Sequence, residues 1–218
     1  MINCLFCLQP VKQSASWELS WFLSEEVLCC SDCVAGFEKL TGPLCSMCSR
    51  ESSDEFCKDC QGREFFLDSN RSLYQYNDFA KEYMKKFKFQ GDYIIGAIFQ
   101  KELKKYFAAN KTTIVPIPVS EVRKLERGFN QTTAILNQSN LHYEELLAKK
   151  HSEKQSKKTK RERLETEQVF YVDEEIGSSE KEIILFDDIY TTGSTLNLAA
   201  QALKESGVKK VSSLTIFR

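Results

Sequence analysis

The sequence has no apolar run that approaches the roughly 20 residues needed to cross a membrane as a helix. Its first segment, Met1–Pro10, has neither a basic region nor an apolar core, so we expect no secretory signal. The net charge is only −1, and bulk charge therefore gives no indication of nucleic-acid binding. Together these absences favour a cytoplasmic protein in a reducing environment.

Histidine is also scarce. His142 and His151 are the only two, and neither occurs at a spacing typical of metal ligands. Cysteine, by contrast, occurs nine times. In a reducing compartment thiols are more often metal ligands than disulfide partners. The cysteines are thus the first candidates for a metal site.

Eight of the nine cysteines form four Cys-x-x-Cys pairs. The tight turn within a pair directs both sulfurs to one tetrahedral centre, and two pairs fill four coordination positions. Pairing in chain order predicts two structural zinc sites, with 22 residues between the pairs of the first and eight between those of the second. An interleaved pairing, with ligands exchanged between the sites, is the alternative. The predicted ligands are Cys4, Cys7, Cys30, Cys33, Cys45, Cys48, Cys57 and Cys60.

Cys29 remains outside this pattern, either as a packed thiol or as a substitute for Cys30. Redox catalysis by one pair is a further alternative, but four pairs in so short a stretch favour metal binding. Residues 1–63 carry five Lys/Arg against nine Asp/Glu, and two Zn(Cys)4 centres would add about −2 each, which argues against DNA binding by charge. Docking of a protein partner fits better. The aromatic residues that either contact such a partner or pack the module are Trp17, Trp21, Phe22 and Phe37.

Gly62 and Arg63 mark the boundary that we expect between a cysteine-rich domain, residues 1–63, and a larger domain, residues 64–218. In the larger part strand-like and helix-like segments alternate, which predicts an α/β fold with a mainly parallel sheet. Strands are expected at 65–66, 72–76, 112–117, 168–172, 183–187 and 211–217. Helices are expected at 79–87 with Asp78 as its cap, 93–109, 129–137 and 194–206.

The segment from Ile183 to Thr195 is the most informative part of the chain. An apolar run fits a buried parallel strand, and two acids and a hydroxyl-rich turn follow before a helix begins, capped by Ser194 or Thr195. Open α/β sheets bind ligands at the carboxyl ends of their strands. There the N–H groups at the N-terminus of the following helix favour a phosphate. Asp187 and Asp188 can accept hydrogen bonds from two vicinal hydroxyls. The pattern predicts a ribose 5′-phosphate site, with the phosphate held by Thr191, Thr192, Gly193, Ser194 and Thr195.

This segment resembles the phosphoribosyl pyrophosphate (PRPP) motif of type I phosphoribosyltransferases. The resemblance implies that Asp187 and Asp188 hold the ribose and that Mg²⁺ accompanies the pyrophosphate. It also implies a type I phosphoribosyltransferase-like sheet with flanking helices, with the zinc-ribbon domain as a small N-terminal addition. Purine-salvage members have an aspartate where this chain has Thr191, which argues against transfer to a purine base.

Two further stretches extend the resemblance to essentially the whole chain. Residues 114–119 read IVPIPV and residues 127–131 read RGFNQ. With the cysteine pairs, they are similar to the ComF/GntX family. This similarity implies a role in uptake of transforming DNA at the inner face of the cytoplasmic membrane, with a ComFA-type helicase as partner. The implied pyrophosphate or acceptor contacts are Pro116, Pro118, Arg127 and Gln131, the last two on one face at the start of a helix.

The strongest charge run, residues 149–163, holds eight Lys/Arg in 15 residues. Its composition predicts a solvated loop. Its resemblance to the basic active-site loop of type I phosphoribosyltransferases implies closure over the pyrophosphate, with Gln155 and Arg163 at positions similar to family positions. Binding of single-stranded DNA is a third interpretation, although the run offers no aromatic residue for base stacking before Phe170. Lys88 is a weaker candidate for ligand contact.

Two functional hypotheses follow. The first is a phosphoribosyltransferase with an unidentified acceptor, which displaces pyrophosphate from ribose C1. The second is an accessory protein of DNA uptake that binds PRPP or a ribose-5-phosphate nucleotide and docks a helicase partner or single-stranded DNA. Because a fold does not by itself fix a function, both hypotheses stay open at this point.

Overall fold

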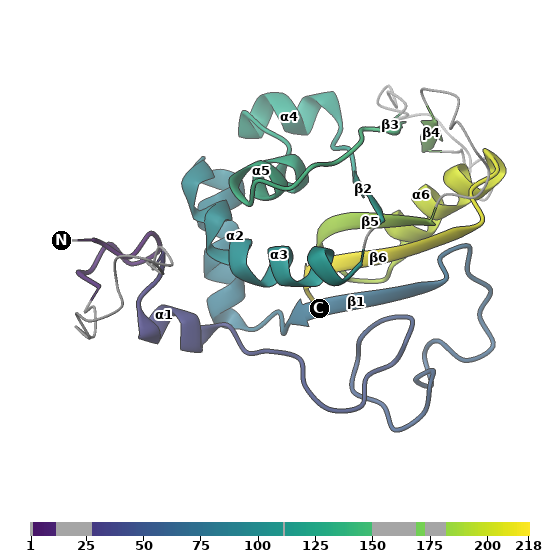
Figure 1. Cartoon of the computed structure of the whole chain (residues 1–218), viewed down its shortest axis with the longest axis horizontal. Coiled ribbons are helices and arrows are strands. Elements are labelled where there is room, and N and C mark those ends of the chain that lie inside the picture. The colour runs from purple at the N-terminus through teal and green to yellow at the C-terminus, as the bar shows by residue number, and fades with distance from the viewer. Residues whose placement is uncertain (1, 12–27, 111, 150–168, 173–181) are drawn as a thin grey trace, which may run out of the picture.

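The computed structural model describes residues 2–11, 28–110, 112–149, 169–172 and 182–218. Within these residues a parallel four-stranded sheet has the order β1-β6-β5-β2 (Figure 1). Its strands are β1 (Ser69–Tyr74), β2 (Thr113–Pro116), β5 (Glu182–Ile189) and β6 (Lys210–Phe217). A separate antiparallel ribbon pairs β3 (Leu147–Lys149) with β4 (Phe170–Val172). The predicted α/β fold with a mainly parallel sheet is confirmed.

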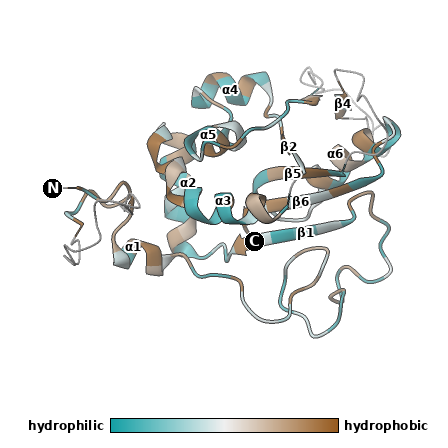
Figure 2. Cartoon of the chain, in the orientation of Figure 1, coloured by the Kyte–Doolittle hydropathy of each residue, from teal (hydrophilic) through white to brown (hydrophobic). Residues whose placement is uncertain are grey.

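Helices cover both faces of the sheet. One face is covered by α2 (Asp78–Phe89), the 3₁₀ helix η1 (Tyr93–Phe99), α3 (Gln100–Ala109) and α5 (Gln131–Gln138), and the other by α6 (Ser194–Glu205). In Figure 2 the ribbon of α3 carries both hydrophilic and hydrophobic colours, as expected of a helix with one face toward solvent. The short helices α1 (Ser31–Gly36) and α4 (Glu121–Arg127) lie outside these layers, and α4 has no buried residue. None of the helices that the structure describes is long and apolar enough to cross a bilayer.

Strand β5 shows how the sequence specifies a sheet covered on both faces. Successive side chains of a strand point to opposite sides. Ile184 and Phe186 lie in the core that includes α2, α3 and α5, whereas Ile183 and Leu185 lie in the core that includes α6. All four are buried, which explains the continuous apolar run in the sequence. Asp187 and Asp188, which follow in the same strand, also point to opposite sides of the sheet.

The two cysteine-rich segments join the cores of opposite faces. The first segment packs with Phe37 and Tyr83 on the α2 side, and the second packs with the residues of β5, β6 and α6. In Figure 1 the first segment lies beyond α2. The second segment follows α1 and runs below β1. The domain boundary at Gly62 and Arg63 stays a prediction.

Several local expectations were wrong. Asn77 rather than Asp78 caps α2, because its side chain accepts a hydrogen bond from the N–H of Ala80 at 2.9 Å. Residues 65–66 are not in a strand, and the helix expected at 93–109 is divided between η1 and α3.

Two more differences concern helix starts. Gly193 is the N-cap of α6, and no side chain makes a capping hydrogen bond there, so the caps predicted at Ser194 or Thr195 are wrong. The helix α4 was not expected. Its N-cap is Ser120, whose hydroxyl accepts a hydrogen bond from the N–H of Arg123 at 3.4 Å.

Candidate functional site

The loop between β5 and α6 has the shape expected of a phosphate-binding turn. Gly193 has a φ of 77°, and a Cβ atom added there would lie 2.2 Å from the hydroxyl of Tyr190. Both the backbone conformation and the close approach therefore require glycine. The Thr192 hydroxyl lies 2.9 Å from that of Ser194 and accepts a hydrogen bond from its N–H at 3.4 Å. The exposed hydroxyls around the turn belong to Thr191, Thr192, Ser194 and Thr195.

The two acids at the end of β5 are held differently. Asp188 is buried, and its carboxylate lies 2.8 Å from the Lys88 ammonium. The Asp187 carboxylate accepts a hydrogen bond from the N–H of Asp188 at 2.8 Å. Burial and the charge of Asp188 raise the pKa of Asp187 to about 7, although Lys88 and Lys149 act in the opposite direction. Hydroxyl donors from a ligand would therefore stabilise a carboxylate that is costly to ionise in the free protein.

Cations from three elements act on this acid pair. Lys88 belongs to α2, and its ammonium contacts Asp188 directly. Burial lowers the pKa of Lys149 on β3, and the charge of Asp187 opposes that shift. Burial also lowers the pKa of Arg127 at the end of α4, where Asp188 acts in the opposite direction. In the sequence Lys149 is the start of a basic run, and only its position at the end of β3 places it near the site.

Arg127 and Gln131 do make a contact, but not on one helix. The Arg127 guanidinium donates a hydrogen bond to the side-chain oxygen of Gln131 at 2.6 Å. Arg127 ends α4 and Gln131 begins α5, and Gly128 turns the chain between them with a φ of 79°. The predicted arrangement on one face of a single helix is therefore wrong, because a sharp turn rather than a helical repeat brings the two side chains together.

A cavity of about 550 Å³ lies beside the end of β2. Pro116 is buried at the end of that strand, whereas Pro118 lines the cavity. Other parts of the lining come from α4, α5, β3 and β4, so residues far apart in the sequence form it. For this reason no acceptor pocket could be predicted from the sequence. The lining includes the aromatic side chains of Tyr93, Phe129 and Tyr171.

Some predicted residues are not in the part of the chain that the structure describes. Gln155 and Arg163 lie outside it, as do Trp17, Trp21 and Phe22. Phe37 is described, and it is 6% exposed within a cluster of aromatic rings. It therefore packs the core rather than offering a surface to a partner.

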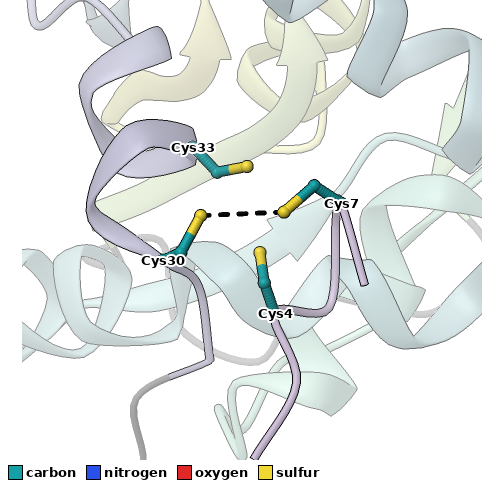
Figure 3. A group of neighbouring side chains, drawn as sticks. All are labelled: Cys4, Cys7, Cys30 and Cys33. Atoms are coloured by element: carbon teal, nitrogen blue, oxygen red, sulfur yellow. Dashed lines mark hydrogen bonds between the residues drawn. The ribbon is translucent and has the colours of Figure 1, made fainter. Parts of the chain in front are cut away.

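The first cysteine group consists of Cys4, Cys7, Cys30 and Cys33 (Figure 3). The four sulfurs lie within 4.8 Å of one another, and those of Cys7 and Cys30 are 3.7 Å apart. Backbone hydrogen bonds, acting against burial, lower the pKa of Cys4 to about 6, which favours a thiolate ligand. The remaining thiol, Cys29, is buried 3.6 Å from the sulfur of Cys4.

The second cysteine group consists of Cys45, Cys48, Cys57 and Cys60, all of them buried. Its sulfurs also lie within 4.8 Å of one another. The N–H of Cys57 donates to the sulfur of Cys45 at 3.2 Å, and backbone hydrogen bonds lower the pKa of Cys45 to about 7 against the effect of burial. Convergent thiols with N–H donors fit a closed tetrahedral metal centre. Both groups can hold a metal ion, and pairing in chain order, not the interleaved alternative, is what the structure shows.

Comparison with known proteins matches residues 92–218 to the family model of the phosphoribosyl transferase domain. The chain is 38% identical over 228 residues to the competence protein ComFC of Bacillus subtilis (strain 168), covering 99% of this chain and 94% of the relative. It is 34% identical over 224 residues to the competence protein ComFC of Streptococcus pneumoniae (strain ATCC BAA-255 / R6), covering both chains in full.

A solved structure of the allosteric regulatory enzyme of purine biosynthesis aligns with a TM-score of 0.39 at 15% identity, covering 57% of this chain and 26% of that one. A similarity this low adds nothing to the argument.

Proposed function

The chain belongs to the family of ComFC competence proteins and carries a phosphoribosyltransferase-type domain, and from this membership we propose that it supports DNA uptake through a site for PRPP. The observation that carries the proposal is the acid pair and the glycine turn at the carboxyl edge of β5. An open α/β sheet binds ligands at this edge. The proposed location is cytoplasmic, at the inner face of the membrane.

In the proposed complex the ligand lies across the end of β5. Asp187 and Asp188 accept hydrogen bonds from the two ribose hydroxyls, and residues 191–195 surround the 5′-phosphate with hydroxyl and N–H donors. Lys88 and Lys149 add positive charge near the acids. Mg²⁺, bound with the ligand, would neutralise the pyrophosphate and make it a better leaving group.

The cavity beside β2 is the proposed acceptor site. Its volume of about 550 Å³ is within the usual range for a small-molecule pocket. Phe129 and Tyr171 offer aromatic surface, so a planar heterocycle fits the lining. This cavity favours the hypothesis of a phosphoribosyltransferase over that of a ligand-binding accessory protein.

The two cysteine groups are proposed to hold Zn²⁺ as structural ions. Zinc takes four thiolates tetrahedrally and leaves no open position for chemistry. A ComFA-type helicase is the proposed partner, and single-stranded DNA is a further candidate. Both rest on family membership rather than on a surface of the described residues.

Calorimetric titration of the zinc-loaded protein with PRPP and Mg²⁺ tests the ligand site. The double variant Asp187→Asn/Asp188→Asn should show no saturable binding. The matched control Glu182→Gln alters an exposed acid at the opposite end of β5, which is paired with Lys210, and should bind as the wild type does. Absence of binding by the wild type would contradict the proposed site.

A transformation assay in cells then links the site to DNA uptake. We expect the double variant to transform at a reduced frequency and the Glu182→Gln control to transform normally. Normal transformation by a double variant that no longer binds PRPP would mean that DNA uptake does not use the ligand.

A further inference from the structure

Arg218 follows β6, and its side chain reaches the glycine turn of the proposed phosphate site. One of its guanidinium nitrogens, Nη1, donates to the carbonyl oxygens of Tyr190 and Thr191 at 3.3 and 3.1 Å. The guanidinium carbon also lies 5.2 Å from the centre of the Tyr190 ring. A single side chain therefore holds two consecutive carbonyls at the start of the turn.

The backbone of Arg218 is fixed where three neighbouring strands end. Its N–H donates to the carbonyl of Tyr74 at the end of β1 at 2.9 Å, and its carbonyl accepts from the N–H of Tyr76 at 2.8 Å. Beside it, the N–H of Tyr190, just after β5, donates to the carbonyl of Phe217 at the end of β6 at 2.9 Å. The ends of β1, β5 and β6 therefore determine from which side the guanidinium approaches the turn.

The two carbonyl contacts decide where the N–H groups of the turn point. In a trans peptide the C=O and the N–H of one plane point in opposite directions. The part of the chain that the structure describes contains no cis peptide bond. Because the carbonyls of Tyr190 and Thr191 point toward Arg218, the N–H groups in the same two planes, those of Thr191 and Thr192, point away from it.

These two N–H groups are available to a ligand. Among the described residues, neither the N–H of Thr191 nor that of Thr192 has a hydrogen-bond acceptor, and both residues are exposed. Gly193 follows them in the left-handed conformation, with a φ of 77°. Successive N–H groups beside a left-handed residue form a concave anion site, and the N-terminus of α6 adds its dipole in the same place.

The Tyr190 ring supports the turn from below. A Cβ atom on Gly193 would be 2.2 Å from the Tyr190 hydroxyl and 2.5 Å from the adjoining ring carbon, so ring and turn are in direct contact. Tyr190 is 3% exposed. A ring packed in this way cannot shift unless the turn shifts with it. Arg218 acts on the same ring and on the carbonyls above it, so both restraints have one origin.

From these contacts we propose that Arg218 is a positioning residue of the phosphate site, which holds the carbonyls of Tyr190 and Thr191 so that the N–H groups of Thr191 and Thr192 face the 5′-phosphate. The inference rests on the proposed PRPP site and adds to it a residue outside the motif. Arg218 acts through the turn, because its Nη1 donors are used by the carbonyls. Without the guanidinium these peptide planes can rotate, and the N–H donors lose their preorganisation.

Substitution of Arg218 in the full-length, zinc-loaded protein tests this role by calorimetric titration with PRPP and Mg²⁺. Arg218→Ala should weaken binding about tenfold, because two charge-assisted hydrogen bonds that hold the turn are lost. Arg218→Lys keeps the charge without the planar fork and should recover part of the affinity. Lys210→Ala is the matched control, since it removes a cation from the other end of β6, where Lys210 pairs with exposed Glu182, and should bind as the wild type does.

Unchanged PRPP affinity in Arg218→Ala, with wild-type binding intact, would overturn the inference and leave the proposed function standing. An Arg218→Lys variant as weak as Arg218→Ala would also overturn it, because an ammonium there can still donate to a carbonyl of the turn. Failure of the wild type to bind PRPP would overturn both this inference and the proposed function.

Amide NMR spectra supply a readout that a general loss of packing would not reproduce. In the wild type, saturating PRPP should move the amide proton signals of Thr191 and Thr192 downfield, as expected of N–H groups that donate to a phosphate. In Arg218→Ala saturated with PRPP these shifts should fall to about half. If Arg218→Ala does not fold, Arg218→Lys replaces it in both measurements. Wild-type signals of Thr191 and Thr192 that do not respond to PRPP, or shifts of equal size in the variant, would overturn the inference.

Discussion

The two cysteine groups offer the same four ligands but depend on their surroundings in different ways. The first is attached through aromatic contacts, since Phe6 and Phe37 pack on Phe79 of α2 with ring centres 4.9 Å apart in each case. The second is attached through buried hydrogen bonds of Ser46 and Ser49 to β1 and lies in the core beside α6. A ligand motif thus predicts a metal centre, but the packing around it decides what the metal supports.

The largest effect should come from the second group. Cys48→Ser removes a buried ligand from a core that includes β2, β5, β6 and α6. We expect loss of one zinc ion and a decrease in the free energy of unfolding of roughly 4 kcal/mol or more, with loss of PRPP binding. Zinc content and denaturant unfolding measure this. A variant that keeps both zinc ions and full stability would show that the second group is not a metal site.

The glycine turn comes next, because it packs directly against the Tyr190 ring. Gly193→Ala should cost roughly 2–3 kcal/mol and weaken PRPP binding more than tenfold, because the new methyl group would meet the Tyr190 hydroxyl and the φ of 77° is unfavourable. Gly207→Ala is the control, since Gly207 has a φ of 96° but open space around it. If both variants bound PRPP like the wild type, close packing under the turn would be irrelevant to ligand binding.

For the first group we expect a smaller and more local effect. Cys7→Ser, at a partly exposed ligand, should release the other zinc ion and cost about 2 kcal/mol. PRPP affinity should stay within about twofold of the wild type. Hydrogen exchange should increase mainly at residues 4–9 and 30–37. A global loss equal to that of Cys48→Ser would remove the distinction between the two groups.

The response of the acid pair to pH can be separated from that of the two groups. Burial raises the pKa of Asp187 from 3.8 to about 7, so the folded protein binds more protons than the unfolded chain between these values. This contribution to stability is present below pH 3.8 and is lost as the pH rises through 7. Asp187→Asn avoids the loss. Its unfolding free energy should match the wild type at low pH and exceed it by about 1–2 kcal/mol at pH 8, with PRPP binding lost.

Denaturant unfolding at pH 4 and pH 8 measures this difference. Glu182→Gln, which changes an exposed acid on the same strand, should show no such growth with pH. An Asp187→Asn variant less stable than the wild type at pH 8 would mean that the ionised carboxylate is already well stabilised in the folded protein.

The smallest effect should be at the link between the first group and α2. The Lys86 ammonium lies 4.2 Å from the centre of the Phe6 ring and donates to the Phe6 carbonyl. Lys86→Met should cost about 1 kcal/mol through loss of both contacts. Thermal unfolding measures this, and PRPP affinity should not change. A tenfold loss of affinity would show that the first group does communicate with the ligand site.

Much of the candidate site could be predicted because its residues are contiguous. Asp187, Asp188 and residues 191–195 come from one strand, one turn and one helix, so local spacing already places them together. The cysteine pairs were predictable for the same reason, since each pair needs only a tight turn. Lys88 was identified as a weak candidate, and its contact with Asp188 depends on how α2 packs against β5.

The errors arose where a contact depends on a turn or on distant packing. Arg127 and Gln131 meet because Gly128 redirects the chain between two helices, which a helical repeat does not describe. The hydroxyl of Ser194 was expected to cap α6, but the left-handed Gly193 occupies the N-cap, and the Ser194 hydroxyl pairs with that of Thr192 instead. Phe37 could belong to a surface or a core, and only the rings around it decide between the two.

The sequence by itself determined the α/β class, the cysteine ligand sets and the ribose-phosphate motif, because each depends on alternation or spacing within a short stretch. Only the tertiary structure decided that the two cysteine groups join opposite faces of the sheet. It also decided that the Arg218 guanidinium donates to the carbonyls of Tyr190 and Thr191. Such contacts join residues remote in the chain, and their positions follow from the packing of whole elements rather than from any local pattern.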